Sequence, residues 1–485
     1  MNLETTSETK PHLGAVLALA CLAQFMVVLD VSVVNVALPA IRSSLHFSEQ
    51  DLQWVVNAYT VTFAGFLLLG GRAADLVGRR RVFISGLVLF ALASLAGGFA
   101  SSQSLLIAAR AAQGLGGAIV APASLSILTT TFEEGAARNR AVGIWGAMGG
   151  AGGAAGVLLG GVLTDLLSWR WILFINVPIG LIAALLAARY IAESRVRMSS
   201  RSFDLAGAVT ATVGLSLLVL GIVETDVTGW GSVSTIGLLA AGALLLILFV
   251  AIEGRFARSP LMPLRIYGSR TLSAANGVVL SVGAASFAMW FFLSLYLQQV
   301  LGYSPLRAGV AFVPMTLCIV AGSTIASRVV TRVGPKPILT AGMSLQAIGL
   351  ALFTQLSPHG TYLGDVLVPS LLIAIGIGFS FVPVTIAAVA GVASEEAGLA
   401  SGLVNTSRLV GGAVGLAVLA ALATARTNGD LNHAVAAHAA LTSGFVLAFG
   451  IAAAFAAAGA VIALLGLPRV SLRGVRRRAI AAESA

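Results

Sequence analysis

The stretch GRAADLVGRRR, residues 71–81, is the clearest indication of the fold of this chain. It carries five charged residues and lies between two apolar runs, 53–70 and 82–100, that carry none. An apolar run of about 20 residues has the length of a helix that crosses a bilayer. The stretch is therefore predicted to be a short polar loop that joins two membrane-spanning helices.

Several residues of this loop suit a tight, positively charged turn. Gly71 and Gly78 permit close helix approach and a tight turn, and Asp75 can cap a helix or pair with an arginine. Three arginines can anchor the loop at the membrane surface: Arg79, Arg80 and Arg81. These residues are predicted to form a conformational motif. The alternative is an ordinary positively charged connecting loop.

The whole chain shares the apolar character of the two runs. Of its 485 residues, 58% are hydrophobic and only 10% are charged. A soluble protein would carry about 25% charged residues, so large soluble domains are excluded. Cys21 and Cys318 both lie in apolar runs, so neither a disulfide framework nor a zinc site is expected.

Fourteen apolar runs are long enough to cross a membrane as helices. Strands of membrane barrels have only about 10 residues, so runs of this length predict an all-α integral membrane protein. The predicted spans are 13–38, 53–70, 82–100, 104–130, 141–164, 171–190, 205–223, 235–252, 271–300, 307–327, 337–356, 365–390, 402–424 and 441–467.

The lysines and arginines predict the side of the membrane that each loop faces. An even number of spans puts both termini on one side, and taking that side as cytoplasmic places 23 lysines and arginines inside and 4 outside. The positive-inside rule therefore predicts cytoplasmic N- and C-termini in the cell (plasma or inner) membrane. The net charge of +10 then reflects topology, with membrane lipids as its partner and no nucleic acid.

An internal repeat predicts the arrangement of the spans. Gly114 and Gly149 match Gly376 and Gly411 at an offset of 262 residues, as do five further residues. Six spans need only about 180 residues, which leaves room for two extra spans between the copies. The predicted plan is two parallel six-helix bundles, 1–190 and 271–467, with two inserted helices and flanking cytoplasmic loops at 191–270 and a basic cytoplasmic tail at 468–485.

Four further stretches accompany the loop at 71–81. They are LDVSVVNVALP (29–39), LIAARAAQGLGGA (106–118), WRWILFINVPIG (169–180) and YLQQVLGYSPLRAG (296–309). Together with the loop, in which Ala73 and Leu76 are departures, they resemble the fourteen-span drug:proton antiporter branch of the major facilitator superfamily. The resemblance implies the major facilitator fold and export of lipophilic drugs or antibiotics by alternating access. It also implies a functional monomer driven by the proton gradient, without a cofactor.

The stretch GGAAGVLLGG, residues 152–161, is similar to the antiporter motif of this superfamily. It departs from the motif at Gly153 and Val157, where prolines are common. Gly152, Gly156 and Gly160 recur every four residues and form a stripe on which another helix can pack closely. Helix packing without a role in antiport is the alternative.

Asp30 is the one carboxylate well inside a predicted span. An ionisable group within the membrane is a functional hypothesis by default, because leaving it unpaired is costly. Loss of water favours the protonated form of a carboxyl, so Asp30 could carry a proton. A structural partnership with a nearby donor is the alternative.

Arg110 is a candidate donor for Asp30. Helical rise places Asp30 about 13 Å and Arg110 about 9 Å below the outer ends of their spans. Gln113, Gly114 and Gly117 share the Arg110 face at helical spacing. The family resemblance implies that this arginine takes part in proton transfer with the first span, 13–38. The hypothesis is that Arg110 lowers the proton affinity of Asp30 in one conformation and separates from it in another, which places proton coupling in the first bundle.

The substrate cavity is predicted from aromatic side chains and a few polar groups, which suit amphipathic ligands. Packing or an interfacial belt is the alternative for each. With Asp30 as the lone deep carboxylate, a site for dications lacks counter-charge, which favours neutral or weakly charged lipophilic substrates. The predicted cavity residues are Gln24, Trp54, Asn57, Trp145, Asn276, Trp290 and Tyr296.

Other function classes have less support in the sequence. A dedicated exporter or importer of a single metabolite is the main alternative, because a fold does not determine its substrate. An enzyme is not expected, since the five histidines map to termini or outer loops and no metal-ligand cluster or GxxxxGK[ST] nucleotide loop occurs. A receptor or scaffold would need larger loops than this chain has.

Overall fold

The computed structural model describes residues 13–133, 136–194, 204–257, 260, 262, 264–389 and 397–468. These residues form helices connected by short loops, and no strand occurs among them. Thirteen helices in the described ranges are long and apolar enough to cross a membrane. The predicted span at 53–70 corresponds to a further helix whose apolar part, Trp54–Leu67, is shorter. The all-α, multi-pass membrane architecture is therefore confirmed.

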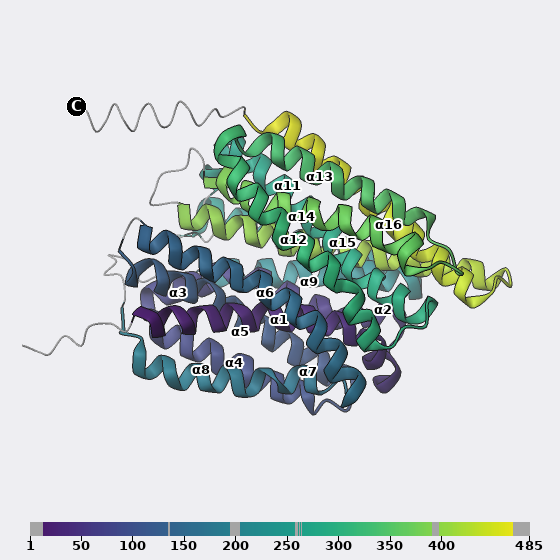
Figure 1. Ribbon diagram of the computed structural model, residues 1–485, viewed down its shortest axis with the longest axis horizontal. Coiled ribbons are helices and arrows are strands. Elements are labelled where there is room, and N and C mark those ends of the chain that lie inside the picture. Colours follow the sequence, from purple (N-terminus) through teal and green to yellow (C-terminus); the bar gives the residue numbers. More distant parts are fainter. Residues whose placement is uncertain are drawn as a thin grey trace, which may run out of the picture.

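The helices of the N-terminal half pack against one another (Figure 1). The main contacts pair α1 with α6, α3 and α4 with α5, and α4 with α8. The helices of this half are α1 (Leu13–Leu45), α2 (Glu49–Leu52), α3 (Trp54–Val77), α4 (Arg79–Gly98), α5 (Gln103–Thr131), α6 (Ala136–Leu166), α7 (Trp171–Phe174) and α8 (Asn176–Tyr190).

The C-terminal half repeats this pairing scheme. Its main contacts pair α11 with α15, α12 and α13 with α14, and α13 with α16, in the same chain order as in the N-terminal half. Such a repetition is what a parallel repeat requires. The helices are α11 (Arg270–Leu295), continued by the π-helical turn η3 (Tyr296–Val300), α12 (Pro305–Val333), α13 (Pro335–Leu352), α14 (Leu367–Val389), α15 (Ala397–Asn432) and α16 (Ala437–Gly466).

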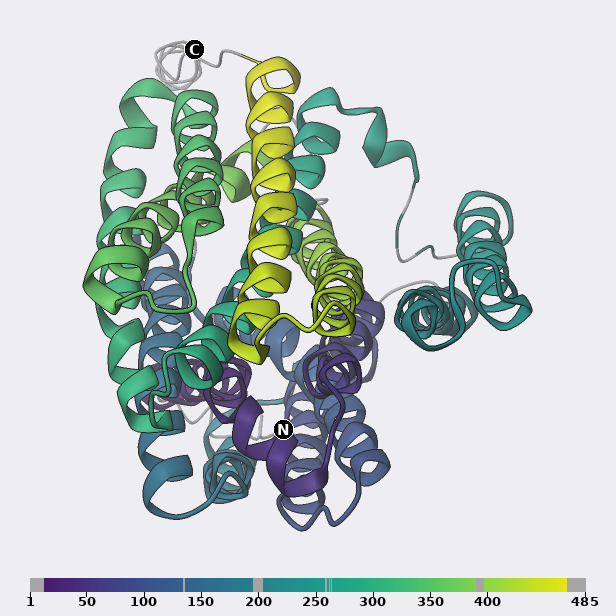
Figure 2. The same ribbon diagram turned by 90° about the vertical axis from the view of Figure 1, so that its right-hand side faces the viewer.

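The two helices between the halves, α9 (Leu205–Thr228) and α10 (Val233–Ala251), lie at the edge of the molecule. Figure 2 shows this teal pair beside the two bundles. The α9 helix packs on α3 and α15, one from each half, through Leu215 and Val219. By contrast, only 11% of the apolar window that contains α10 is buried, which fits a helix that faces lipid. The exact domain limits stay a prediction.

The stretch at 71–81 is mostly helical, which corrects the loop predicted from its charges. The α3 helix continues to Val77, and α4 starts at Arg79, so the turn consists of Gly78 alone. The α15 helix likewise continues to Asn432, beyond the predicted span end at residue 424. Hydrophobicity marks the part of a helix that lies in lipid, but a helix can extend beyond it into water.

The two halves contact each other through α6 with α12 and through α3 with α15. Hydrogen bonds also join them at the end of the bundle opposite Leu13, where α1 begins, which we call the far end. Here Ser294 Oγ donates to the Asn35 carbonyl oxygen at 2.7 Å, and Gln298 Nε2 donates to the Val36 carbonyl oxygen at 2.9 Å. These bonds join α1 to α11 and its π-helical extension. Because they link the two halves directly, they close the bundle at this end.

Glycines allow α1 and α6 to pack with their backbones nearly in contact. A Cβ atom built at Gly152, Gly156 or Gly160 would lie 2.6, 2.8 and 2.8 Å from the carbonyl oxygens of Phe25, Leu29 and Val33, respectively. Carbon and oxygen atoms do not approach so closely without displacement of the backbone. The glycine stripe is therefore required for the contact that places α1 within the bundle.

The glycine contact predicts the effect of a larger side chain. Gly156→Val should lower the free energy of unfolding by about 1–3 kcal/mol, because the new side chain would meet the α1 backbone. Gly143→Val on the same helix is the matched control, since a Cβ there meets no described atom within 4 Å. Denaturant unfolding of both purified variants measures the difference. Equal losses of stability would contradict the packing role.

Candidate functional site

Asp30 lies at the centre of a buried polar network in the N-terminal half. The side chain, on α1, is fully buried. Its Oδ2 accepts a hydrogen bond from Arg110 Nη1 at 2.5 Å, and its Oδ1 accepts from Gln113 Nε2 at 3.0 Å and from Asn176 Nδ2 at 2.8 Å. The donors belong to α5 and α8, so one carboxylate connects three helices.

Arg110 is held by more than its ion pair. It is 2% exposed, its Nε donates to the Val55 carbonyl oxygen at 2.9 Å, and its Nη1 donates to Gln113 Oε1 at 2.9 Å. The guanidinium also lies 4.6 Å from the centre of the Tyr59 ring, within cation–π range. Val55 and Tyr59 both belong to α3. This helix therefore provides partners that would remain if the bond to Asp30 were broken.

Small residues on α5 bring Arg110 close to these partners. A Cβ atom at Gly114 would lie 2.3 Å from the Tyr59 carbonyl oxygen, and one at Gly117 would lie 2.9 Å from the Tyr59 hydroxyl oxygen. Both glycines share the Arg110 face of the helix. Because neither carries a side chain, α5 packs directly on α3 and its arginine reaches α1.

The structure thus brings together Asp30, Arg110 and Gln113, which share a depth or a helix face in the sequence. Two further members were not singled out from the sequence: Asn176, and Ser94 on α4, whose hydroxyl accepts from Gln113 Nε2 at 2.6 Å. The only signal for Asn176 is an amide within the apolar stretch at 169–180. The role of the pair in proton coupling stays a prediction.

Some buried polar atoms near this network have no hydrogen-bond partner within the described structure. They include the Tyr59 hydroxyl, Asn176 Oδ1, Gln53 Nε2 directly before α3, and Asn57 Oδ1 on α3. A buried polar group without a partner is costly, and in native proteins it often marks a functional site. These atoms can form new hydrogen bonds if the network rearranges.

The predicted conformational motif is closed by a residue far away in sequence. Gly78 adopts a φ of 127°, which favours glycine, and a Cβ there would lie 2.6 Å from Glu193 Oε1. The Glu193 carboxylate accepts the backbone N–H groups of Arg80 at 3.2 Å and Arg81 at 3.3 Å. These groups form the N-terminus of α4, where a negative charge is stabilising. Glu193 therefore links this turn to the end of α8.

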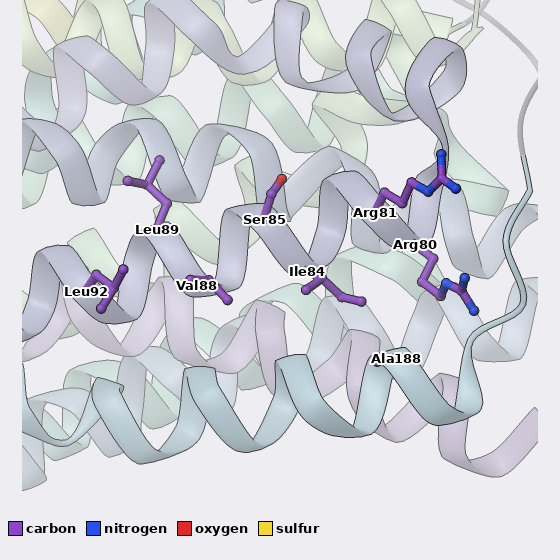
Figure 3. A pocket seen from close by; sticks show the side chains of 8 residues that line it. All are labelled: Arg80, Arg81, Ile84, Ser85, Val88, Leu89, Leu92 and Ala188. Carbon is purple, nitrogen blue, oxygen red and sulfur yellow. The ribbon is translucent and has the colours of Figure 1, made fainter.

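Other members of the motif differ in their surroundings. The Arg79 Nε donates to Ser126 Oγ at 2.6 Å, which ties the turn to α5. Arg80 and Arg81 lie at one end of an apolar groove between α4 and α8 that has a volume of about 620 Å³ (Figure 3). The Gly71 Cβ position meets only Pro122 within 4 Å, at 3.5 Å. The side chain of Asp75 lies outside the described part of the structure.

The predicted cavity residues do not all lie together. Asn276 and Tyr296 are twenty residues apart on one continuous helical segment, which corresponds to about 30 Å. Asn276 Oδ1 accepts from Ser407 Oγ at 2.7 Å, whereas the Tyr296 hydroxyl donates to the Ser357 carbonyl oxygen at 2.8 Å near the far end. One small substrate could not touch both side chains.

The remaining candidates occupy several helices. Trp145 Nε1 on α6 donates to Ser124 Oγ at 3.0 Å, and Trp290 on α11 packs on Phe312 with ring centres 5.0 Å apart. Three others, Gln24, Trp54 and Asn57, lie on α1 and α3. Their contact with substrate stays a prediction. No group of three or more potential metal ligands occurs among the described residues.

Comparison with known proteins gives one family. The family model described as "Major Facilitator Superfamily" matches residues 20–416 and 279–482. A solved bacterial homologue of the human lysosomal transporter Spinster, described as inward-facing and unoccupied, superposes with a TM-score of 0.65 over 95% of this chain and 99% of that chain. At 17% identity this likeness concerns the fold alone.

Two curated relatives are much more similar in sequence. The "Cephamycin export protein CmcT" of Amycolatopsis lactamdurans is 47% identical, over 88% of this chain and 88% of the relative. The "Puromycin resistance protein pur8" of Streptomyces alboniger is 41% identical, over 91% of this chain and 88% of the relative. Both matches extend over most of each protein.

The ion pair between Asp30 and Arg110 predicts that removing one of the two charges destabilises the protein more than removing both. Arg110→Met should lower the free energy of unfolding by about 3 kcal/mol, because it leaves a buried carboxylate without its cation. The double variant Asp30→Asn/Arg110→Met should recover much of this loss, because neither charge remains. Denaturant unfolding of wild type, both single variants and the double variant gives the coupling free energy. A coupling near zero would show that the pair does not act as a unit.

Proposed function

The chain belongs to the major facilitator superfamily, and on this premise we propose that it is a secondary active transporter that exports lipophilic drugs or antibiotics in exchange for protons. The relatives described as a cephamycin export protein and a puromycin resistance protein support export of such compounds. They also support a transporter rather than an enzyme. The proton gradient would be the energy source, and a monomer would suffice.

The observation that carries proton coupling is the Asp30 carboxylate. It is fully buried, and its ion-pair partner is the guanidinium of Arg110. Protonation of Asp30 would remove one charge from the pair and leave the guanidinium without its counter-ion. Arg110 would then be held by the Val55 carbonyl oxygen, Gln113 and the Tyr59 ring. The two protonation states therefore favour different arrangements of α1 and α5.

The position of Asp30 on α1 suggests how a proton could move the two halves. Asn35 and Val36 lie five and six residues further along the same helix, about 8 Å away, and their carbonyl oxygens accept the bonds that close the far end. A shift of α1 that separates Asp30 from Arg110 would also strain these bonds. Proton binding could in this way alternate access between the two ends of the bundle.

Direction of transport depends on the orientation in the membrane. The excess of arginines at the end that carries the chain termini supports cytoplasmic termini in the cell membrane. The closed far end would then face outward, and the protein would be ready to receive substrate from the cytoplasm or the inner leaflet. Outward transport driven by inward proton flow follows from this orientation.

Dedicated transport of a single metabolite is the second candidate function. The fold permits it, because a major facilitator fold does not determine the substrate. It would use the same Asp30 network, so the range of substrates is what distinguishes the two functions. A panel of unrelated compounds therefore belongs in the test.

The proton-coupling proposal predicts that Asp30→Asn abolishes gradient-driven transport. An asparagine cannot take up and release a proton, although it keeps the size of the side chain. The effect is measured with everted membrane vesicles that carry an imposed proton gradient and are incubated with a panel of drugs and dyes. Wild-type vesicles should accumulate several compounds, and Asp30→Asn vesicles should lose at least about 90% of this accumulation, a tenfold effect.

A matched control removes a carboxylate outside the long helices. Asp51→Asn, in the short helix α2, should transport like the wild type. Equal proton-coupled transport by Asp30→Asn, or accumulation that depends on ATP and survives an uncoupler, would refute the coupling role. Accumulation of one compound alone would favour the single-metabolite function.

A further inference from the structure

Arg408 is a cation inside a membrane-spanning helix that the network around Asp30 does not use. It lies on α15, six residues after the start of the apolar segment Gly402–Asn432, or about 9 Å along the helix. An arginine at such a depth is costly unless it is paired or faces a polar space, so its presence points to a function.

No carboxylate balances Arg408 in the part of the chain that the structure describes. Its one recorded side-chain interaction there is with the ring of Phe381 on α14, whose centre is 5.8 Å from the guanidinium carbon. This distance is at the outer limit of a cation–π contact, which does not neutralise a charge. The contrast with Arg110 is direct, because Arg110 is paired with Asp30.

Arg408 lies beside the boundary between the two halves. The next residue, Leu409, packs within the hydrophobic cluster of the N-terminal half, and Val410 packs against the same cluster. The backbone of Arg408 also contacts α11, because a Cβ at Gly283 would lie 2.0 Å from the Arg408 carbonyl oxygen. The helix around Arg408 is therefore enclosed by other helices on these sides.

The side chain itself remains accessible. Arg408 is half-buried, and Phe381 beside it is 40% exposed. Helical rise places Phe381 about 12 Å from the end of α14 and Arg408 about 16 Å from the start of α15, and both of these helix ends lie on the side where α1 begins. A guanidinium and an aromatic ring, both partly exposed, thus lie together at a similar depth along their helices.

We propose that Arg408 and Phe381 form a binding site for an organic anion, in which the guanidinium binds a carboxylate and the phenyl ring packs on the apolar body of the same molecule. The inference rests on the proposed export function, and it names the class of substrate. An arginine forms two parallel hydrogen bonds with a carboxylate, and this pairing is strong where water is scarce. The substrate would supply the negative charge that no described carboxylate supplies.

This inference refines the expectation of neutral or weakly charged substrates. That expectation follows from Asp30 as the lone deep carboxylate, which disfavours dications. In the structure Asp30 is paired with Arg110, whereas Arg408 has no carboxylate partner among the described residues. An amphipathic molecule with one negative charge complements it.

The test compares three probes that share a naphthyl ring: 1-naphthylacetate, its uncharged methyl ester, and the cation 1-naphthylmethylammonium. Equilibrium dialysis against the purified full-length protein in lipid nanodiscs measures their binding, with empty nanodiscs subtracted. The wild type should bind the acid at least about tenfold more tightly than the ester, and the cation most weakly. No preference for the acid would overturn the proposal.

Variants assign the preference to this site. Arg408→Gln should bind acid and ester equally, whereas Arg408→Lys should keep part of the preference because it keeps the charge. Arg426→Gln removes an arginine from the exposed end of the same helix and should bind like the wild type. A preference that survives Arg408→Gln would overturn the assignment. If Arg408→Gln does not fold, Arg408→Lys and Phe381→Leu decide. Arg408→Lys should lower the acid preference without abolishing it, whereas Phe381→Leu should weaken the binding of acid and ester alike and leave their ratio unchanged.

The measurement separates this proposal from proton coupling. Binding to nanodiscs needs no gradient, so the acid preference is expected in Asp30→Asn as well. If Asp30→Asn loses vesicle transport but keeps the acid preference, the anion site is supported independently of proton coupling. If the wild type binds and transports the ester and the acid equally, the anion site is refuted and proton-driven export is unaffected.

Discussion

The interior of the membrane tolerates a charge only where another group compensates it, and the ion pair between Asp30 and Arg110 meets this requirement. The pair does more than neutralise a carboxylate, because its partners lie on α1, α3, α5 and α8. Its geometry therefore depends on the relative positions of four helices. A change in the charge of Asp30 alters the contacts among all of them, and for this reason a single proton could act on a whole bundle.

Close backbone contacts make such a response possible. The glycines of α6 hold α1 near its own backbone, and Gly114 does the same for α5 on α3. Helices that meet through glycines approach closely, because no side chain stands between their backbones. The same residues thus bring Asp30 and Arg110 together, and any motion that separates the pair has to break these contacts.

The number and order of the spans could be predicted from hydrophobicity, because span length depends on local sequence. The pairing of Asp30 with Arg110, 80 residues apart, could be predicted because they are opposite charges at similar depths in two spans. The roles of Asn176 and Glu193 could not, since Asn176 is 146 residues from Asp30, and Glu193 is 113 residues from Arg80. The sequence between these residues does not show that they approach each other in the fold. The loop predicted from the charges at 71–77 is wrong, because a charged segment can remain helical where it leaves the lipid.

If Asp30 takes up the proton and Arg408 binds the substrate, the two halves have different tasks. Arg110 is paired with Asp30 in the N-terminal half, whereas Arg408 in the C-terminal half has no carboxylate partner among the described residues. A proton and an anionic substrate would then bind at separate sites and would not compete for one carboxylate. Coupling between them would have to pass through the boundary of the halves, where Leu409 packs on the N-terminal cluster and Gln298 holds α1. On this arrangement exchange is enforced by the contact between the bundles, and the chemistry of the substrate can vary without loss of proton coupling.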